Sequence, residues 1–325
     1  AKAPAVPKAE RRLLIYDANV EYGGHRSIPY ANYAFSRMGQ KTGAFTAVVM
    51  RDPSAFRKEN LEQFDAVCLN NTVGNLFSDS VLRQNFLEFI RVGGGLLGIH
   101  GATVAFTDFP NGAKETWPEF GRLLGGRGAA HLAADERIVI KSDSPDHPLN
   151  RPFGGNSFEH TSEFFRVHEP YSRELVHVLF SIDTSKTELP PQGTHPGLER
   201  ADDDYALAWT KSYGRGRVVY CTIGHSPKDF MDPVVLEFYL GAIQFVLGDL
   251  PGSTAPSQSK EWQPLFDGKT LTGWHAVGDG KWTVEDGAIV GRADNEKLYG
   301  LLFTDQKYSN FTVRFQFKVL AGDSG

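Results

Sequence analysis

The sequence predicts a doubly wound α/β domain with a parallel sheet, followed by a smaller all-β domain. Between residues 12 and 249, short apolar runs typical of strands alternate with segments of helical periodicity. A polar, proline-interrupted stretch follows, and after it the pattern contains strands only. A chain of 325 residues is long enough for two such cores. We therefore expect two domains of different class.

The first half of the chain supplies alternating strands and helices. Short apolar runs predict buried strands at residues 13–16, 45–50, 65–69 and 96–99. Helical spacing predicts helices at residues 27–38 and 78–92, and the second helix places Leu82, Phe86 and Ile90 on one face. Crossovers through a helix favour parallel neighbours in a sheet.

The second half adds more strands and a closing helix. Strands are predicted at residues 137–141, 175–182, 206–211 and 217–222. The segment Tyr213-Gly214-Arg215-Gly216 joins the last two and is typical of a hairpin turn. Apolar residues at helical spacing then predict a helix over residues 232–247.

The pattern divides the chain into four segments. We expect a disordered leader at residues 1–11, the α/β domain at 12–249, a linker at 250–260 and a β domain at 261–325. The β domain has strand patterns at 282–284, 288–290, 301–303 and 311–319, which are too few for a whole sandwich. It is therefore expected to be the N-terminal part of one.

Composition and charge exclude several classes of partner. The net charge of -5 does not favour the basic surface that nucleic-acid binding requires. The sequence also has no window of eighteen apolar residues that could span a membrane. Cys68 and Cys221 each lie in an apolar run and are expected in the core. The chain begins at Ala1, which fits a mature terminus after signal-peptide removal. A periplasmic or secreted location is therefore expected, with a cytoplasmic one as the alternative.

Three histidines follow predicted strands. His25 comes after the first strand, His100 directly follows the strand at 96–99 within the glycine-rich segment 93–103, and His225 comes after the strand at 217–222. Because open α/β sheets bind ligands at the carboxyl ends of their strands, these side chains are expected to share one edge. The alternative is that each histidine only hydrogen-bonds a neighbouring loop.

The residue types at this edge suit two kinds of chemistry. Imidazoles with a carboxylate bind zinc, manganese or a similar divalent ion, and imidazoles also move protons near neutral pH. No HExxH motif is present to specify the metal. The turn carries His100 where a hydrolase would have serine in Gly-x-Ser-x-Gly. Neither glycine run completes a Walker or dinucleotide motif, so no nucleotide cofactor is expected.

In combination, several stretches between residues 12 and 249 resemble the ThuA-like (trehalose utilisation) family. The matching stretches are residues 93–100, 123–126 with His131, 146–149, 208–210, and 213–218 with 224–225. The resemblance implies a flavodoxin-like or amidotransferase-like parallel sheet with histidine at the turn where class I glutamine amidotransferases carry cysteine. One departure is that the family's usual Asp-Glu-x-Tyr is here Ser162-Glu163-Phe164-Phe165. Glu163 is retained, whereas the second carboxylate and the phenol are absent.

The segment after the linker resembles the beginning of the 3-keto-disaccharide hydrolase family, a concanavalin-like sandwich. The matching stretches are residues 262–274 and 282–289, and the pattern at 311–325 fits the same family. Both resemblances are to families associated with sugars oxidised at C3. Together they imply that the partner is a small-molecule carbohydrate.

The implied activity is cleavage of 3-keto-glycosides by C2 proton abstraction and elimination, or isomerisation of the keto sugar. A non-catalytic carbohydrate-binding protein is the alternative. The catalytic candidates are His100, Glu163 and His225. The candidates for substrate binding are His25, Arg26, His131 and Trp209. The candidate ligands of a divalent metal are His25, His100, His225 and Glu163.

Overall fold

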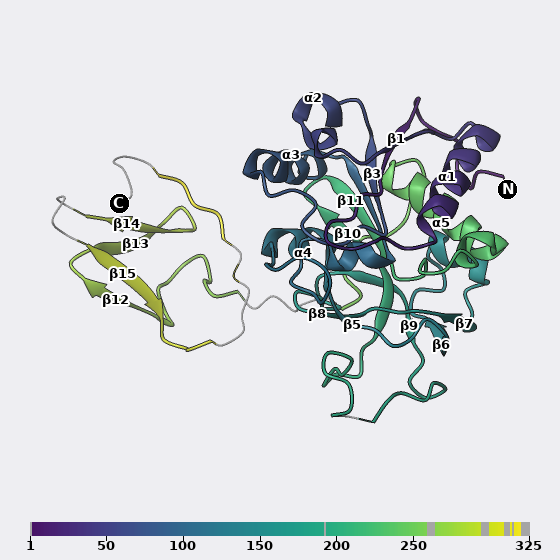
Figure 1. The fold of residues 1–325 in the computed structure, drawn as a ribbon. Coiled ribbons are helices and arrows are strands. Elements are labelled where there is room, and N and C mark those ends of the chain that lie inside the picture. Colours follow the sequence, from purple (N-terminus) through teal and green to yellow (C-terminus); the bar gives the residue numbers. More distant parts are fainter. Residues whose placement is uncertain are drawn as a thin grey trace. The chain divides into compact units, whose positions relative to one another are not determined.

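The computed structural model describes residues 2–191, 193–258, 264–293, 299–308, 313 and 315–319. It divides into two compact units, Ala1–Ser259 and Lys260–Gly325 (Figure 1). The first unit contains the α/β domain predicted from the sequence, and the second has the predicted all-β character. Each is described by itself.

The first unit is built on one nine-stranded sheet of order β2-β1-β3-β4-β11-β10-β9-β6-β7. In that order the strands are Thr46–Met50, Arg12–Tyr16, Ala66–Asn70, Gly95–Ile99, Gly216–Cys221, Ala206–Tyr213, His177–Ile182, Glu136–Ser142 and Phe158–Ser162. The first five are parallel, as expected, whereas the last four pair antiparallel. The sheet is therefore mixed, because β10 and β11 form the predicted hairpin, with Tyr213 paired to Gly216.

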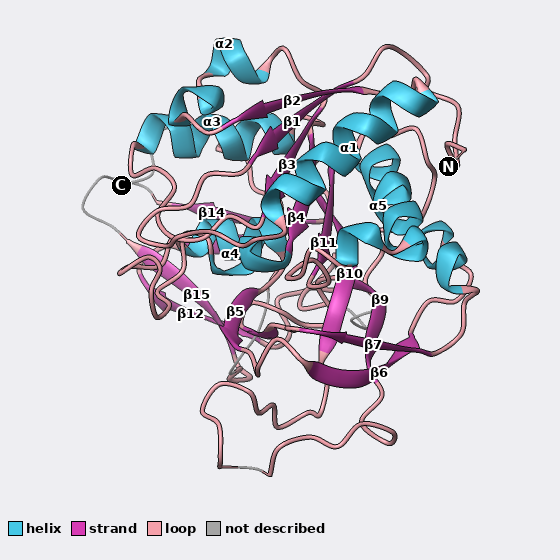
Figure 2. Ribbon diagram, turned by 45° about the vertical axis from the view of Figure 1, so that its right-hand side comes forward, coloured by secondary structure: helices cyan, strands magenta, loops and turns pink. Residues whose placement is uncertain are grey.

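Helices cover both faces of the parallel half. Helices α1 (Ile28–Thr42) and α5 (Pro233–Val246) pack on one face, and α3 (Ser80–Arg91) and α4 (Pro118–Leu124) pack on the other (Figure 2). Strand residues alternate between the two cores, so that Leu13 and Ile15 of β1 face α1 whereas Leu14 and Tyr16 face the other layer. This two-sided burial explains why the strands are continuous apolar runs rather than alternating ones.

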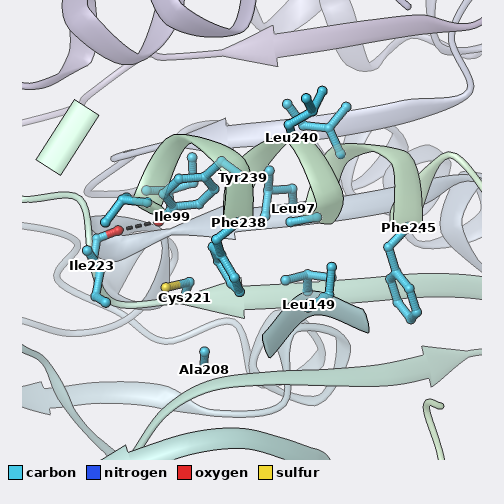
Figure 3. Packing of buried hydrophobic residues seen from close by; sticks show 14 of the residues in the cluster. Leu97, Ile99, Leu149, Ala208, Cys221, Ile223, Phe238, Tyr239, Leu240 and Phe245 are labelled. Atoms are coloured by element: carbon cyan, nitrogen blue, oxygen red, sulfur yellow. Dashed lines mark hydrogen bonds between the residues drawn. The ribbon is translucent and has the colours of Figure 1, made fainter. Parts of the chain in front are cut away.

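Helix α5 is the most deeply buried helix of the unit. Phe238, Tyr239 and Phe245 lie against the apolar residues of β4 and β11 (Figure 3). The hydroxyl of Tyr239 donates a hydrogen bond to the carbonyl of Ile223, in the loop after β11. A Cβ at Gly95 would come within 2.2 Å of the Val246 carbonyl oxygen, so the glycine allows the helix to approach β4 closely. The core thereby supports the two strands that carry His100 and His225.

The helix ends follow from local sequence. The Asp79 side chain accepts a hydrogen bond from the Val81 N–H at the start of α3, and Asp232 caps α5 in the same way. Helix α1 continues to Thr42, four residues beyond the predicted end, where Gly43 adopts φ +66° and its N–H closes the helix on Gly39.

Several short elements escaped prediction because they lack an apolar pattern. These are α2 (Lys58–Leu61), β5 (Arg127–Ala130), β7, β8 (Arg166–His168) and the 3-10 turns Pro53–Phe56, His100–Val104, Pro148–Phe153 and Asp229–Met231. Strand β5 pairs with β8 outside the main sheet.

The leader, expected to be disordered, is held against α5. The backbone of Ala5 exchanges two hydrogen bonds with the Gln244 side chain, and the Lys8 N–H donates to Asp249. Arg11 also forms an ion pair with Asp249 at 2.8 Å. Composition alone did not reveal these partners, which lie about 240 residues away in the chain.

The expected linker is also part of the first unit. Ser253 accepts a hydrogen bond from the Thr210 hydroxyl at 2.7 Å, and Ala255 accepts one from His177 at 2.6 Å. The Ser257 N–H donates to Val176 at 3.0 Å. Residues 250–258 thus lie along β9 and β10, and the division between the units falls after Ser259.

The described part of the second unit contains two antiparallel pairs of strands. Strand β12 (Trp274–Gly278) pairs with β15 (Gly300–Thr304), and β13 (Lys281–Glu285) pairs with β14 (Ala288–Arg292). The strands predicted at 282–284, 288–290 and 301–303 are confirmed. Of the strand predicted at 311–319, residues 313 and 315–319 lie outside any strand, and residues 311, 312 and 314 are outside the described residues. Across the described part of the chain, no helix is long and apolar enough to cross a membrane.

Candidate functional site

The sheet brings the three strand-end histidines together. Strands β1, β3, β4 and β11 are consecutive neighbours, and His25, His100 and His225 follow three of them. The centroid of the His100 ring lies 5.0 Å from that of the His25 ring and 5.2 Å from that of the His225 ring. The group lies beside β1 and β3, where the strand order reverses and α/β sheets bind their ligands.

His100 occupies a strained turn that directs its ring. Its φ is +43°, a left-handed conformation that few residues with a side chain adopt. The Tyr220 hydroxyl donates to the His100 carbonyl at 3.0 Å, and the ring Nδ1 lies 2.8 Å from the Thr222 carbonyl. Since a carbonyl can only accept, Nδ1 carries the proton and Nε2 presents its lone pair.

Glu163 reaches the cluster from the far edge of the sheet. It follows β7, which is separated from β11 by three strands. Two anchors fix the segment: the Phe165 N–H donates to the Thr222 hydroxyl at 2.9 Å, and the Ser162 hydroxyl donates to Asp229 at 3.0 Å. The carboxylate thereby lies 3.3 Å from His100 Nε2, 3.3 Å from His131 Nδ1 and 3.7 Å from His225 Nε2.

The donor atoms fit a divalent metal ion. One ligand atom each from His25, His100, Glu163 and His225 lies within 4.8 Å of the other three. Three buried ring nitrogens in this group, His25 Nδ1, His100 Nε2 and His225 Nδ1, lack a hydrogen-bond partner among the described residues. Buried polar atoms normally have partners, and three imidazoles with one carboxylate suit zinc- or manganese-type ions.

The electrostatics of the cluster favour the protonation states that bind metal. Burial, followed by the charges of His100 and His225, lowers the pKa of His25 to about 3. Burial and His100 also lower the pKa of His225. Burial acts to raise the pKa of Glu163, but the neighbouring imidazoles, His100 first among them, outweigh it and lower this pKa. At neutral pH, His25 is therefore a neutral donor and Glu163 an anionic one.

We expect the metal-free protein to lose stability on acidification through His25. The folded pKa of about 3 lies below the ordinary 6.5, so the unfolded chain binds more protons between these values. Stability is fully present above pH 6.5 and falls as the pH drops, by about 1.4 kcal/mol per pH unit. Urea denaturation in chelator at pH 7, 6, 5 and 4 measures this slope. His25→Phe should flatten it, and the prediction is wrong if the variant keeps the wild-type slope.

Not every sequence candidate lies at the cluster. Arg26 is exposed, and no described hydrogen bond or ion pair connects it to the histidines. Trp209 is fully buried, and its Nε1–H donates to the Leu124 carbonyl at 2.9 Å. The expectation that Trp209 contacts a sugar is therefore wrong for this structure, because the ring lies in the core between the sheet and α4. His131 is beside the cluster, with 34% of its side chain exposed.

Other residues at the site were not among the candidates. The Phe165 ring lies 4.9 Å from that of His100 and 5.0 Å from that of His131. Phe165 stands where the Asp-Glu-x-Tyr pattern described above has tyrosine, so an apolar ring contacts these two imidazoles. The carboxylate of Asp229, which is 2% exposed, accepts hydrogen bonds from the Ser162 hydroxyl and the Ser226 N–H. Asn71 follows β3 and is fully buried. Asn71 and Asp229 carry no local motif, and their roles arise from tertiary contacts.

Fold and site together define an α/β protein with three histidines and one glutamate at the switch point of its sheet. The chain belongs to the ThuA family, described as Trehalose utilisation, which matches residues 12–246. Residues 261–325 match a 3-keto-alpha-glucoside-1,2-lyase-like domain. Both resemblances read from the sequence are thus confirmed, as is their fusion in one chain.

Solved structures support the same fold. A putative ThuA-like protein from Bacteroides uniformis is 22% identical with a TM-score of 0.58, and the match covers 78% of this chain and 98% of that one. A putative ThuA-like protein from Parabacteroides merdae is 16% identical with a TM-score of 0.53, covering 76% of this chain and 93% of that one. No curated protein matches the chain in sequence.

Proposed function

We propose that the chain is a metal-dependent enzyme that acts on 3-keto-glycosides. The observation that carries this proposal is the convergence of His25, His100, His225 and Glu163 within 4.8 Å at the ligand-binding edge of the sheet. The carbohydrate association of the matched families supplies the substrate class. The name of the second domain points to a 1,2-elimination on a keto sugar.

The chemistry begins with the acidity of the C2 proton beside the C3 ketone. A base removes this proton, and the C2–H electron pair forms an enolate. The enolate then forms the C1–C2 double bond as the C1–O bond breaks and the departing alkoxide takes a proton. Water can add across the double bond and complete hydrolysis, whereas reprotonation of the enolate without elimination gives isomerisation. A divalent ion would be held by His25, His100, His225 and Glu163, and when bound it would supply Lewis-acid chemistry at this edge of the sheet.

Proton transfer is best assigned to the pair formed by Glu163 and His131. His131 Nδ1 lies 2.9 Å from the Leu132 carbonyl and 3.3 Å from Glu163, so both acceptors hold the proton on this nitrogen. The other nitrogen, Nε2, is then left as the base, as in other carboxylate-oriented imidazoles. Among the catalytic candidates from the sequence, His100 is fully buried and suits a ligand role better.

Activity assays with chelator test this proposal. The wild-type chain should cleave or isomerise a 3-keto-glucoside but not the unmodified glucoside, and a chelator should abolish turnover reversibly. Glu163→Gln should lower kcat by about 100-fold or more, because it removes a ligand and the group that orients His131. Glu159→Gln is the matched control, since Glu159 is an exposed acid on β7, the strand that precedes Glu163, and is paired with Arg137. Wild-type turnover that persists without metal would refute the metal-dependent reaction.

A second candidate is a carbohydrate-binding protein without turnover. Phe165 places an apolar ring against both His100 and His131 where a phenol would offer a proton, which favours binding over catalysis. Tyr22, 37% exposed and 5.1 Å from the His25 ring, is available to stack on a sugar. Calorimetry that shows binding of a 3-keto-glucoside with no product formed would favour this candidate.

A further inference from the structure

Asn71 lies at the centre of the site without belonging to the metal-binding set. It follows β3, the strand between β1 and β4, and its side chain is fully buried. Its φ is +54°, a left-handed conformation that asparagine adopts more readily than most residues. The turn after β3 thus bends the chain so that the amide remains inside the protein.

The amide group of Asn71 connects the loops that carry the three histidines. Its Nδ2 lies 3.1 Å from the carbonyl of Gly224, the residue before His225, and 3.4 Å from the hydroxyl of Ser27, two residues after His25. The same nitrogen lies 3.3 Å from Oδ1 of the neighbouring Asn70. The Oδ1 of Asn71 accepts from the N–H of Gly101, the residue after His100, at 3.4 Å. Among the residues that the structure describes, no other side chain hydrogen-bonds to all three loops.

The surroundings of Asn71 leave little freedom for these loops. A Cβ at Gly101 would lie 3.1 Å from His25 Cε1 and 3.4 Å from the Asn71 carbonyl carbon. The neighbouring Asn70 donates to the Ile28 carbonyl at 3.1 Å, at the start of α1, and thereby holds the helix that follows His25. The three loops therefore pack around one amide rather than on one another alone.

We propose that Asn71 is a positioning residue that sets the mutual distances of the three imidazoles and so the affinity and geometry of the metal site. The histidines come from loops far apart in the sequence, and each loop alone leaves the distances to the other two undetermined. A single buried amide whose oxygen and nitrogen lie within hydrogen-bond distance of all three loops fixes these distances. The metal part of this inference rests on the proposed function, whereas the positioning of the imidazoles does not.

Asn71→Gly in the full chain tests the role of the amide. Glycine accepts positive φ, so this variant removes the side chain without adding backbone strain. Co²⁺ and Zn²⁺ affinities are measured by chelator competition, and the visible d–d absorption of bound Co²⁺ reports the coordination geometry. We expect affinity about 10-fold to 100-fold weaker and a changed Co²⁺ spectrum. Wild-type affinity together with a wild-type spectrum would overturn the proposal.

Asn150→Ala is the matched control. Asn150 is 1% exposed, and its amide donates to Ser142, Ser144 and Leu179, away from the histidine loops. This variant should lower the thermal midpoint while leaving the Co²⁺ affinity and spectrum at wild-type values. A purely structural role for Asn71 would instead make the two variants behave alike.

A metal-free measurement separates the two proposals. In chelator, imidazole ¹⁵N NMR of Asn71→Gly should show shifted signals for His25, His100 and His225, with His147 and His177 unchanged. If the wild-type chain binds neither Co²⁺ nor Zn²⁺, the proposed metal function fails and these spectra decide the positioning role. Unchanged signals from all three cluster histidines would contradict it.

Discussion

Replacing His100 with alanine should abolish stoichiometric metal binding and lower turnover of a 3-keto-glucoside by about 1000-fold. His100 is the innermost member of the cluster, with no exposed surface and its Nδ1 hydrogen-bonded to the Thr222 carbonyl. This hydrogen bond directs Nε2 toward Glu163, 3.3 Å away. Alanine would leave three of the four donors, which would bind the ion weakly.

Metal content after dialysis, calorimetric titration with Zn²⁺ and Mn²⁺, and turnover measure the effect. His147→Ala is the matched control, because His147 is 6% exposed and packs against His177 and Phe245 away from the cluster. His225→Ala removes a more accessible ligand and tests the same site if His100→Ala fails to fold. Full metal content and full turnover in a folded His100→Ala protein would refute the assignment of His100.

Trp209→Ala should lower the free energy of unfolding by about 3–5 kcal/mol while the metal affinity of the folded protein stays unchanged. The Trp209 ring is fully buried, 4.5 Å from the Tyr220 ring and 5.5 Å from the Tyr171 ring. Its Nε1–H donates a hydrogen bond to the Leu124 carbonyl at the end of α4. Alanine would leave a large cavity and an unpaired carbonyl, both of which cost stability.

Urea denaturation and Zn²⁺ titration separate stability from binding. Trp209→Phe keeps most of the apolar volume and should recover part of the lost stability, which identifies packing as the cause. A Trp209→Ala protein of normal stability that no longer binds a 3-keto-glucoside would restore the sugar-binding role expected from the sequence.

The parallel half of the sheet and three members of the site were predictable because their signals are local. Continuous apolar runs marked β1, β3, β4 and β11, and helical periodicity marked α1, α3 and α5. Parallel neighbours present their carboxyl ends at one edge, so the positions of His25, His100 and His225 followed from their places after strands. The hairpin between β10 and β11 had its own turn signal.

The remaining site residues depend on contacts between distant parts of the chain. The resemblance to a family pointed to Glu163, but the strand pattern did not, since β7 lies at the opposite edge of the sheet. Trp209 looked suited to sugar stacking, yet its position on β10 turns the ring into the core. The leader and residues 250–258 looked unstructured because their partners, including Gln244 and Thr210, are on the folded domain.

The sequence by itself determined the α/β class, the strand-end positions of three histidines and the family of each unit, because periodicity and motifs are properties of short segments. Tertiary structure decided the distances among His25, His100 and His225, the approach of Glu163 and the central place of Asn71. These depend on how strands order and how loops pack. Residues more than a hundred positions apart meet there, and no local pattern encodes the contact of Asn71 with Gly224.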